Sequence, residues 1–143
     1  MIITSPTTIE ITKALLGFHS EVEKISKDAS NPFFKSSYAS LSNILDSIKQ
    51  PLAKNKLTFV QFPEGANGLT TRLMHESGEW METTYIMTPA KNDPQGLGSA
   101  ITYQRRYSLG AVLGLNVSED DDGNAASTKG ETRTKQTADD LNL

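Results

Sequence analysis

The chain has 143 residues and no cysteine, so we expect one domain with a real core and neither disulfides, zinc-thiolate sites nor a cysteine nucleophile. No segment approaches the roughly 18 consecutive apolar residues that a membrane span needs, and the first ten residues lack the pattern of a signal peptide. The composition therefore excludes membrane-spanning and disulfide-rich proteins, and we expect a soluble, cytoplasmic protein.

The net charge of −3 is unevenly distributed. Residues from 117 onward hold seven acidic and three basic side chains, a net charge of −4, which leaves residues 1–116 at +1. A body this close to neutral permits binding to a polyanion without indicating it. The chain is therefore expected to divide into one domain, residues 1–116, and an acidic tail, residues 117–143.

The N-terminal part has apolar side chains at helical spacing, which predicts a first helix over residues 7–27. Thr7 or Thr8, followed by Glu10, provides a start signal. His19 lies within this helix, and we interpret it as a partly exposed surface histidine.

The next segment, residues 29–41, is predicted to be a loop because it contains an Asn-Pro pair and several serines. Its aromatic and basic side chains are Phe33, Phe34, Lys35 and Tyr38. Aromatic rings beside a lysine are typical of surfaces that bind single-stranded nucleic acid, because bases stack on rings and the cation neutralises phosphate. For the two phenylalanines we favour the alternative that they fill the core, while Lys35 stays a candidate functional residue.

Residues 40–54 predict a second helix, with a stripe of apolar side chains and Ser40 or Ser42 as its cap. Pro51 lies near the end of this helix. Because a proline inside a helix costs about 3 kcal/mol, we expect a break or kink just before it.

Three short segments with β-branched and aromatic residues follow, residues 57–62, 69–75 and 79–88. The turn signals between them predict an antiparallel three-stranded meander. Alternation along the strands does not say which face of the sheet is exposed. The side chains whose placement stays open are Arg72, His75, Trp80 and Tyr85.

Residues 93–115 predict a long helix, with Asn92 or Asp93 as its cap and Pro94 in the first position. On a 3.6-residue period the expected apolar arc comprises Leu97, Ala100, Ile101, Ala111, Val112 and Leu115. The opposite, polar arc comprises Gln95, Ser99, Thr102 and Arg106, with Arg105 at its border. Because arginine presents a planar, permanently charged fork that matches phosphate, the polar arc predicts an anion-binding face. An ordinary amphipathic helix with solvated arginines is the alternative.

This helix also contains four glycines, Gly96, Gly98, Gly110 and Gly114. Each weakens an isolated helix by roughly 1 kcal/mol relative to alanine. We therefore expect them to permit a close approach to the sheet, to a neighbouring subunit or to a ligand.

The predicted order is helix, helix, three antiparallel strands, helix. It indicates an α+β domain whose sheet buries one face under helices and leaves the other face for a ligand or partner. Residues 117–140 show no periodic apolar pattern, so we expect this acidic C-terminal tail to be disordered. Residues 139–143, two acids and two leucines around an asparagine, are interpreted either as a docking peptide or as a plain polar terminus.

Three stretches of the chain together resemble the ERF family of phage recombination proteins. They are NPFFKSSYASLSNIL at 31–45, DPQGLGSAITYQRRYSLGAVLGL at 93–115 and SEDDDGN at 118–124, in this order. The resemblance covers about residues 8–124. It implies ATP-independent binding of single-stranded DNA and annealing of complementary strands in phage homologous recombination and DNA repair, in the cytoplasm of the host cell.

The resemblance also implies a fold similar to that of the ring-forming single-strand annealing proteins, a homo-oligomer in the form of a ring or filament, and no cofactor. A partner exonuclease or single-strand-binding protein is the expected partner of the C-terminal tail. Carried over residue by residue, the family motif makes Arg105 and Arg106 the expected phosphate contacts. The other expected DNA-binding positions are Lys35, Tyr38, Gln95, Thr102 and Tyr103.

Two other functions compete with this one. A metal-dependent nuclease would use the acidic run Asp120–Asp122 to hold Mg²⁺, but consecutive acids point in different directions, so a solvated acidic run is favoured. A protein-protein scaffold without DNA binding is the second alternative. The chain has no nucleotide-binding lysine motif, and its two histidines, His19 and His75, are far apart in sequence.

Overall fold

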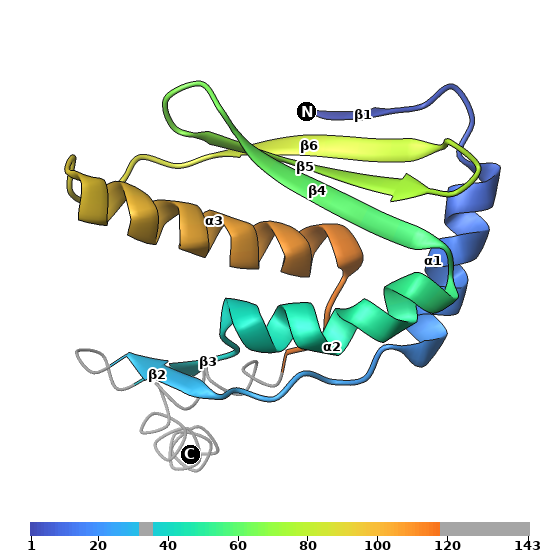
Figure 1. Cartoon of the computed structure of the whole chain (residues 1–143), viewed down its shortest axis with the longest axis horizontal. Helices are drawn as coiled ribbons and strands as arrows, with labels where there is room; N and C mark the ends of the chain where they lie inside the picture. Colours follow the sequence, from blue (N-terminus) through green and yellow to red (C-terminus); the bar gives the residue numbers. More distant parts are fainter. Residues whose placement is uncertain (32–35, 118–143) are drawn as a thin grey trace, which may run out of the picture.

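The structure is a computed structural model that describes residues 1–31 and 36–117 (Figure 1). It contains, in chain order, β1 (Ile2–Thr4), α1 (Ile9–Glu21), β2 (Ala29–Asn31), β3 (Ser36–Tyr38), α2 (Leu41–Lys54), β4 (Leu57–Glu64), β5 (Gly68–His75), β6 (Trp80–Ile86) and α3 (Pro94–Leu113). The predicted α+β class, with its two helices, antiparallel meander and final long helix, is confirmed.

The main sheet has four antiparallel strands in the order β1-β6-β5-β4. The meander β4-β5-β6 was predicted, whereas β1 was not, because three residues are too few to show an alternating pattern. The prediction of a loop over residues 29–41 is wrong in part, since β2 and β3 form a small hairpin in which Ala29 pairs with Tyr38. Lys35 and the two phenylalanines before it lie outside the described residues.

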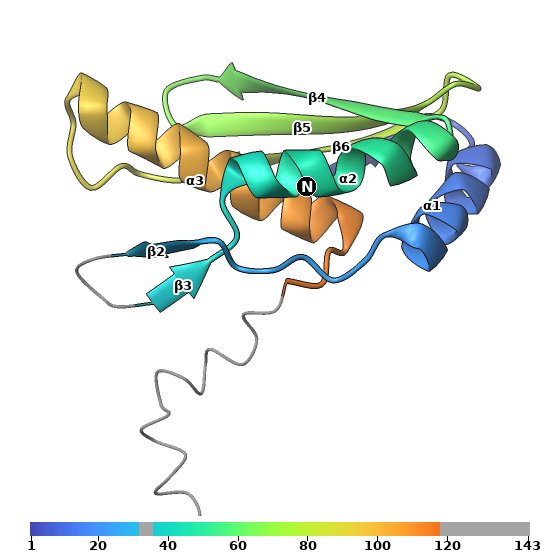
Figure 2. The ribbon, with the colours of Figure 1, turned by 60° about the horizontal axis from the view of Figure 1, so that its bottom comes forward.

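The helices lie on one side of the main sheet (Figures 1 and 2). α3 and α1 pack against β5, and α2 packs against β4, α1 and α3. The core between helices and sheet is made mainly of aliphatic side chains, with Phe18 at its α1 end. Its fully buried large members are Ile11, Phe18, Ile25, Ile48, Leu73, Leu109 and Leu113.

α1 is shorter than predicted at its C-terminal end. It stops at Glu21, because Val22 adopts extended backbone angles. The remainder of the predicted helix is not helical, and Ile25 forms a parallel bridge with Val117 just beyond α3. Ile25 therefore matches the spacing of the predicted apolar stripe, although it lies outside α1.

The start of α1 is capped by a residue distant in sequence. Thr8 occupies the N-cap position, but its side chain makes no capping hydrogen bond. Instead the Glu79 carboxylate accepts hydrogen bonds from the Ile11 backbone N–H at 2.8 Å and from the Thr7 hydroxyl at 2.7 Å. This carboxylate ties α1 to the turn before β6.

α2 begins as predicted, with the Ser40 hydroxyl accepting a hydrogen bond from the Asn43 N–H at 3.1 Å. The expected break before Pro51 is wrong, since the helix continues to Lys54. Proline this close to the end of a helix removes one backbone hydrogen bond, while the buried residues on either side of it, Ile48 and Leu52, hold the last turn against the core.

α3 buries a face that overlaps the predicted apolar arc only in part: Ala100 is buried, and Val112 and Leu115 pack against the core. Its buried residues are Ala100, Gln104, Ser108, Leu109 and Leu113. Leu97 and Ile101, expected inside, are 38% and 36% exposed. The buried face contains Gln104 because its side-chain amide donates hydrogen bonds to the carbonyl oxygens of Asn67 at 2.8 Å and Tyr85 at 3.0 Å. A polar residue with this many partners is stable inside, which apolar periodicity cannot anticipate.

Two of the four glycines have a structural role within the chain, one through a close approach and the other through its backbone conformation. A side chain at Gly96 would collide with the backbone of Lys91, and Gly114 ends the helix in the left-handed region with a φ of 62°. Gly98 and Gly110 face open space, with nothing within 4 Å of a Cβ built there. No part of the described chain approaches Gly98 or Gly110 closely, so for these two an approach by a neighbouring subunit or a ligand stays a prediction.

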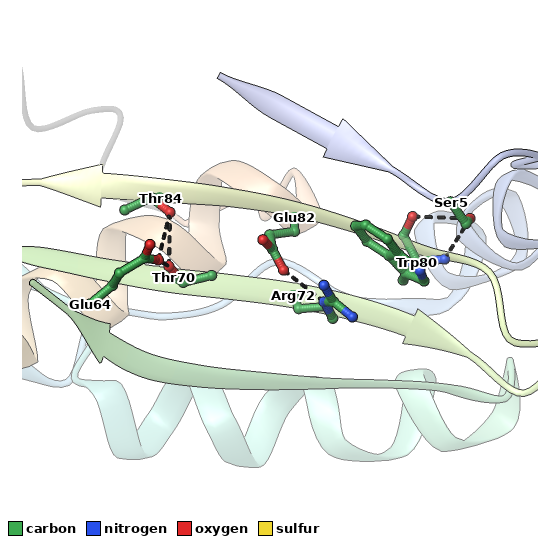
Figure 3. Close-up of polar contacts among 7 residues, drawn as sticks. All are labelled: Ser5, Glu64, Thr70, Arg72, Trp80, Glu82 and Thr84. Carbon is green, nitrogen blue, oxygen red and sulfur yellow. Dashed lines mark hydrogen bonds and ion pairs between the residues drawn. The ribbon is translucent and has the colours of Figure 1, made fainter.

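The face of the sheet opposite the helices carries a polar network (Figure 3). Arg72 donates to Glu82 at 2.7 Å and its guanidinium lies 3.9 Å from the centroid of the Trp80 ring. Strand register places Tyr85 opposite Leu69 and His75 opposite Leu57, both buried, so these two side chains share the other face. The four residues left open by the sequence therefore divide between the two faces.

Candidate nucleic-acid interface

The predicted polar arc of α3 lies at the surface. Gln95, Ser99 and Thr102 are exposed and Arg106 is half-buried. The Thr102 hydroxyl donates to the backbone carbonyl of Gly98 at 3.1 Å, one turn earlier. The arc presents its polar groups away from the main sheet because the buried face, anchored by Gln104, is on the other side.

The two adjacent arginines point in different directions, as expected for neighbours about 100° apart around a helix. Arg105 is directed toward β4, where its Nε donates to Gln61 Oε1 at 3.1 Å and Gln61 Nε2 donates to the Arg105 carbonyl at 3.3 Å. Arg106 is directed toward the small hairpin, with its guanidinium carbon 4.3 Å from the centroid of the Tyr38 ring. The structure therefore does not place the two guanidinium groups side by side.

Arg106 belongs to a cluster of four side chains that we call the tyrosine-arginine cluster: Tyr38, Tyr103, Arg106 and Tyr107. The Arg106 guanidinium lies 5.6 Å from the ring centroid of Tyr103 and 5.5 Å from that of Tyr107. The rings of Tyr103 and Tyr107 are tilted with their centroids 4.2 Å apart. Cation-ring contacts of this kind contribute about 0.5–1 kcal/mol at exposed sites. They hold the charged fork in place at the surface.

The cluster carries a positive charge at neutral pH. A side-chain hydrogen bond with Tyr107 raises the pKa of the Tyr103 phenol above its usual value, burial raises it further, and Arg106 opposes the rise. The phenol is therefore protonated under physiological conditions. Among the described residues, no carboxylate lies within ion-pair distance of Arg106, so its charge is available to an anionic ligand.

Tyr38 is positioned by the β2–β3 hairpin and by Asp28. Its carbonyl accepts the Asp28 backbone N–H at 3.1 Å. The Asp28 carboxylate in turn accepts hydrogen bonds from the Ser40 N–H at 2.7 Å and hydroxyl at 2.8 Å. The hydrogen bond from the Ser40 backbone N–H is the main cause of the lowered pKa of Asp28, and the hydrogen bond from the Ser40 hydroxyl lowers this pKa further. These bonds fix the end of the hairpin, and with it the Tyr38 ring, beside α3.

A hollow of about 320 Å³ opens beside the cluster, and we call it the Arg106 hollow. Three members of the cluster line it. Its other walls come from the end of α3, the chain beyond α3 and the start of α2. The lining residues are Tyr38, Ala39, Ile44, Arg106, Tyr107, Gly110, Ala111, Leu115, Asn116 and Val117.

A second hollow, of about 400 Å³, lies at the other end of α3. It is lined by Lys91, Gln95, Ser99 and Tyr103, among others. The exposed surface of α3 therefore offers two concave regions in succession, each with a cation and at least one tyrosine. Tyr103 belongs both to this second hollow and to the tyrosine-arginine cluster.

The structure brings some of the predicted site residues together and separates others. Tyr38, Tyr103 and Arg106 meet in one cluster, and Gln95 reaches the second hollow. Thr102 is exposed and lines neither hollow, and Arg105 donates a hydrogen bond to Gln61 on β4. Lys35 lies outside the described residues.

Two candidate residues were missed from the sequence, Tyr107 and Lys91. The spacing of Tyr103 and Tyr107 by four residues already places both rings on one face of a helix. Lys91 carried no comparable signal, because it precedes the helix and reaches the second hollow only through the path of the chain before α3.

Within the described residues no group of three or more histidine, cysteine, aspartate or glutamate side chains is arranged to hold a metal ion. The acidic run Asp120–Asp122, on which the nuclease alternative depends, lies outside those residues. No helix in the part of the chain that the structure describes is both long and apolar enough to cross a membrane.

Comparison with known proteins identifies one family. The sequence model of the ERF superfamily matches residues 11–141. Neither a curated protein nor a solved structure matches the chain.

Proposed function

Because the chain belongs to the ERF superfamily, we propose that it binds single-stranded DNA and anneals complementary strands during phage homologous recombination, in the cytoplasm of the host cell. The activity is a non-enzymatic one that needs neither ATP nor a cofactor. The single observation that carries the proposal is the tyrosine-arginine cluster, in which Arg106 is held among three tyrosine rings at the surface of α3.

The chemistry of the cluster suits a single strand. Every nucleobase offers a face that can stack on an aromatic ring or on a guanidinium plane, and the positive charge attracts the phosphate backbone. Tyr107 is 51% exposed and Tyr103 is 37% exposed, so both rings are accessible to a ligand. A duplex hides the faces of its bases, so a surface of this kind favours single strands.

Annealing follows from binding that leaves most base edges free. Cations along the strand lower the repulsion between two phosphate backbones, and base pairing between the strands then supplies the specificity. Arg106 and Lys91 lie at separate hollows along α3 and can neutralise separate stretches of one strand. The residues before 117 carry a net charge of only +1, so the attraction depends on these local cations.

We also propose that the protein acts as a homo-oligomer, a ring or a filament, because one subunit contacts few nucleotides and linked subunits multiply the contacts. Both edges of the main sheet support this proposal. β4 and β1 each lack a strand partner on one side among the described residues. Val60 and Phe62 on β4 are 39% and 45% exposed, and Ile3 on β1 is 44% exposed. Unpaired, apolar edge strands are surfaces on which another chain adds.

A hollow of about 350 Å³ beside β4 supports the same interface. It lies between β4 and α2 and is lined mainly by apolar side chains, including Leu45, Leu52 and Phe59. Head-to-tail contact between the β4 edge of one copy and the β1 edge of the next generates a ring or filament rather than a closed pair. The C-terminal residues 139–143 remain the proposed docking peptide for an exonuclease or single-strand-binding protein.

The binding part of the proposal is tested by titrating a fluorescent oligothymidylate with wild-type protein and with Arg106→Gln over a series of salt concentrations. Loss of one phosphate-neutralising charge is expected to weaken binding at low salt and to reduce the slope of log K against log salt by about 0.7. Lys13→Gln on α1 is the matched control, since this exposed lysine lies on another element. A slope that is the same for all three proteins would contradict the assignment.

A further inference from the structure

The position of the Arg106 hollow along α3 argues against phosphate as its main occupant. Its α3 wall runs from Arg106 and Tyr107 to Gly110 and Ala111 in the last turns, and the hollow continues past the helix end to Leu115 and Val117. The carbonyl groups at the C-terminal end of a helix carry partial negative charge, which disfavours an anion nearby. A neutral group therefore fits this end of the helix better than a phosphate does.

The walls of the hollow suit a planar, uncharged ring. Ala39, Ile44 and Leu115 supply aliphatic surface that contributes nothing to phosphate binding. Tyr107 and Arg106 supply an aromatic ring and a guanidinium plane, the two surfaces on which nucleobases stack in single-stranded recognition. Asn116, exposed at the margin, adds an amide able to donate and accept hydrogen bonds at a base edge.

We propose that the Arg106 hollow takes one nucleobase of the bound strand, stacked against Tyr107 and Arg106. This inference rests on the proposed function, because it assigns the part of the ligand that the site holds. The volume of about 320 Å³ lies at the lower end of the range of about 300–1,000 Å³ for small-molecule pockets. A base held in this way is withdrawn from pairing, so the strand pairs through the bases between successive subunits.

The chain offers a matched pair of substitutions for the test. Gly110 lines the hollow and Gly98 does not, and a Cβ added at either position has no neighbouring atom within 4 Å. Both are interior positions of α3, and leucine is a better helix former than glycine at each. Gly110→Leu therefore fills the hollow without removing a charge or a ring, while Gly98→Leu makes the same change elsewhere on the helix.

The experiment measures the affinity of full-length protein for an oligothymidylate and for the same strand with abasic positions, at several salt concentrations. Wild-type protein and Gly98→Leu are expected to prefer the intact strand. Gly110→Leu is expected to bind the intact strand about 5- to 150-fold more weakly, equivalent to roughly 1–3 kcal/mol for one stacked base. Because no charge is lost, its salt slope is expected to equal that of the wild type.

The outcomes separate this inference from the function on which it rests. If the wild type binds no single-stranded DNA, the proposed function fails. If the wild type binds but Gly110→Leu matches Gly98→Leu on both strands, DNA binding stands and the base site is refuted. Should Gly110→Leu fail to fold, Tyr107→Ala and Tyr107→Phe provide the comparison. A site for a base requires loss of the intact-strand preference in the alanine variant and its retention in the phenylalanine variant.

Discussion

Replacing Gln104 by methionine is expected to destabilise the domain while leaving the DNA-binding surface in place. Gln104 is 2% exposed, and its amide donates to the carbonyl oxygens of Asn67 and Tyr85. Two hydrogen bonds are lost, each with a net contribution of about 1 kcal/mol. The Asn67 carbonyl keeps a second donor, the Met87 N–H at 3.0 Å, and Tyr85 lies opposite Leu69 in the β5–β6 ladder, so neither carbonyl adds the full cost of a buried acceptor without a donor.

Methionine keeps the length of the side chain and adds apolar surface, which offsets about 1 kcal/mol of the loss. We therefore expect the free energy of unfolding to fall by about 1 kcal/mol, measured by urea titration followed by circular dichroism. Gln50→Met on α2, an exposed position, is the control and is expected to change stability by less than about 0.5 kcal/mol. The reasoning is refuted if Gln104→Met is as stable as the wild type.

Two other predictions concern the hairpin and the oligomer. The native structure lowers the pKa of Asp28, so its stabilising effect should be complete above the unfolded pKa of about 3.9 and should disappear as pH falls through the native value. Asp28→Asn is therefore expected to be less stable than the wild type at neutral pH, and the difference between their urea midpoints is expected to vanish in acid. A difference that is the same at every pH would contradict a stabilising role for the Asp28 carboxylate. Val60→Lys at the exposed edge of β4 is expected to reduce the oligomer to smaller species in sedimentation velocity, whereas Leu16→Lys, which replaces another exposed apolar residue, should leave the distribution unchanged.

The sequence predicted best those features that depend on a residue with a specific structural role, such as a helix cap. Of the two candidates at each helix start, Asp93 before Pro94 caps α3 and Ser40 caps α2. The meander was predictable because side chains alternate along three consecutive strands joined by tight turns. These features depend on neighbours in the chain, and for that reason sequence alone was sufficient.

The failures occurred where distant residues determine the outcome. The buried face of α3 includes Gln104 because its side-chain amide donates hydrogen bonds to the carbonyl groups of Asn67 and Tyr85. The spacing of apolar residues along α3 gives no information about these distant partners. Ile25 fitted the stripe of α1 but is buried through a bridge to Val117, about ninety residues later in the numbering.

In the candidate site, too, the sequence predicted what depends on α3 alone and missed what depends on distant segments. Arg106 was selected on helical spacing and family resemblance and Tyr103 on the resemblance alone, and their side chains do lie together. Their meeting with Tyr38 depends on the hairpin and on Asp28, which fixes its end. Lys91 reaches its hollow through the fold alone.

The most direct test of the central claim is the annealing rate of two complementary labelled oligonucleotides in the presence of EDTA and without ATP. Wild-type protein is expected to accelerate annealing above the spontaneous rate, Lys13→Glu to do so equally, and Arg106→Glu to lose most of the acceleration because its charge now repels the strand. Equal acceleration by Arg106→Glu would contradict a role for the tyrosine-arginine cluster. Absence of annealing by the wild type, with cleavage of the strands on adding Mg²⁺, would contradict the function itself.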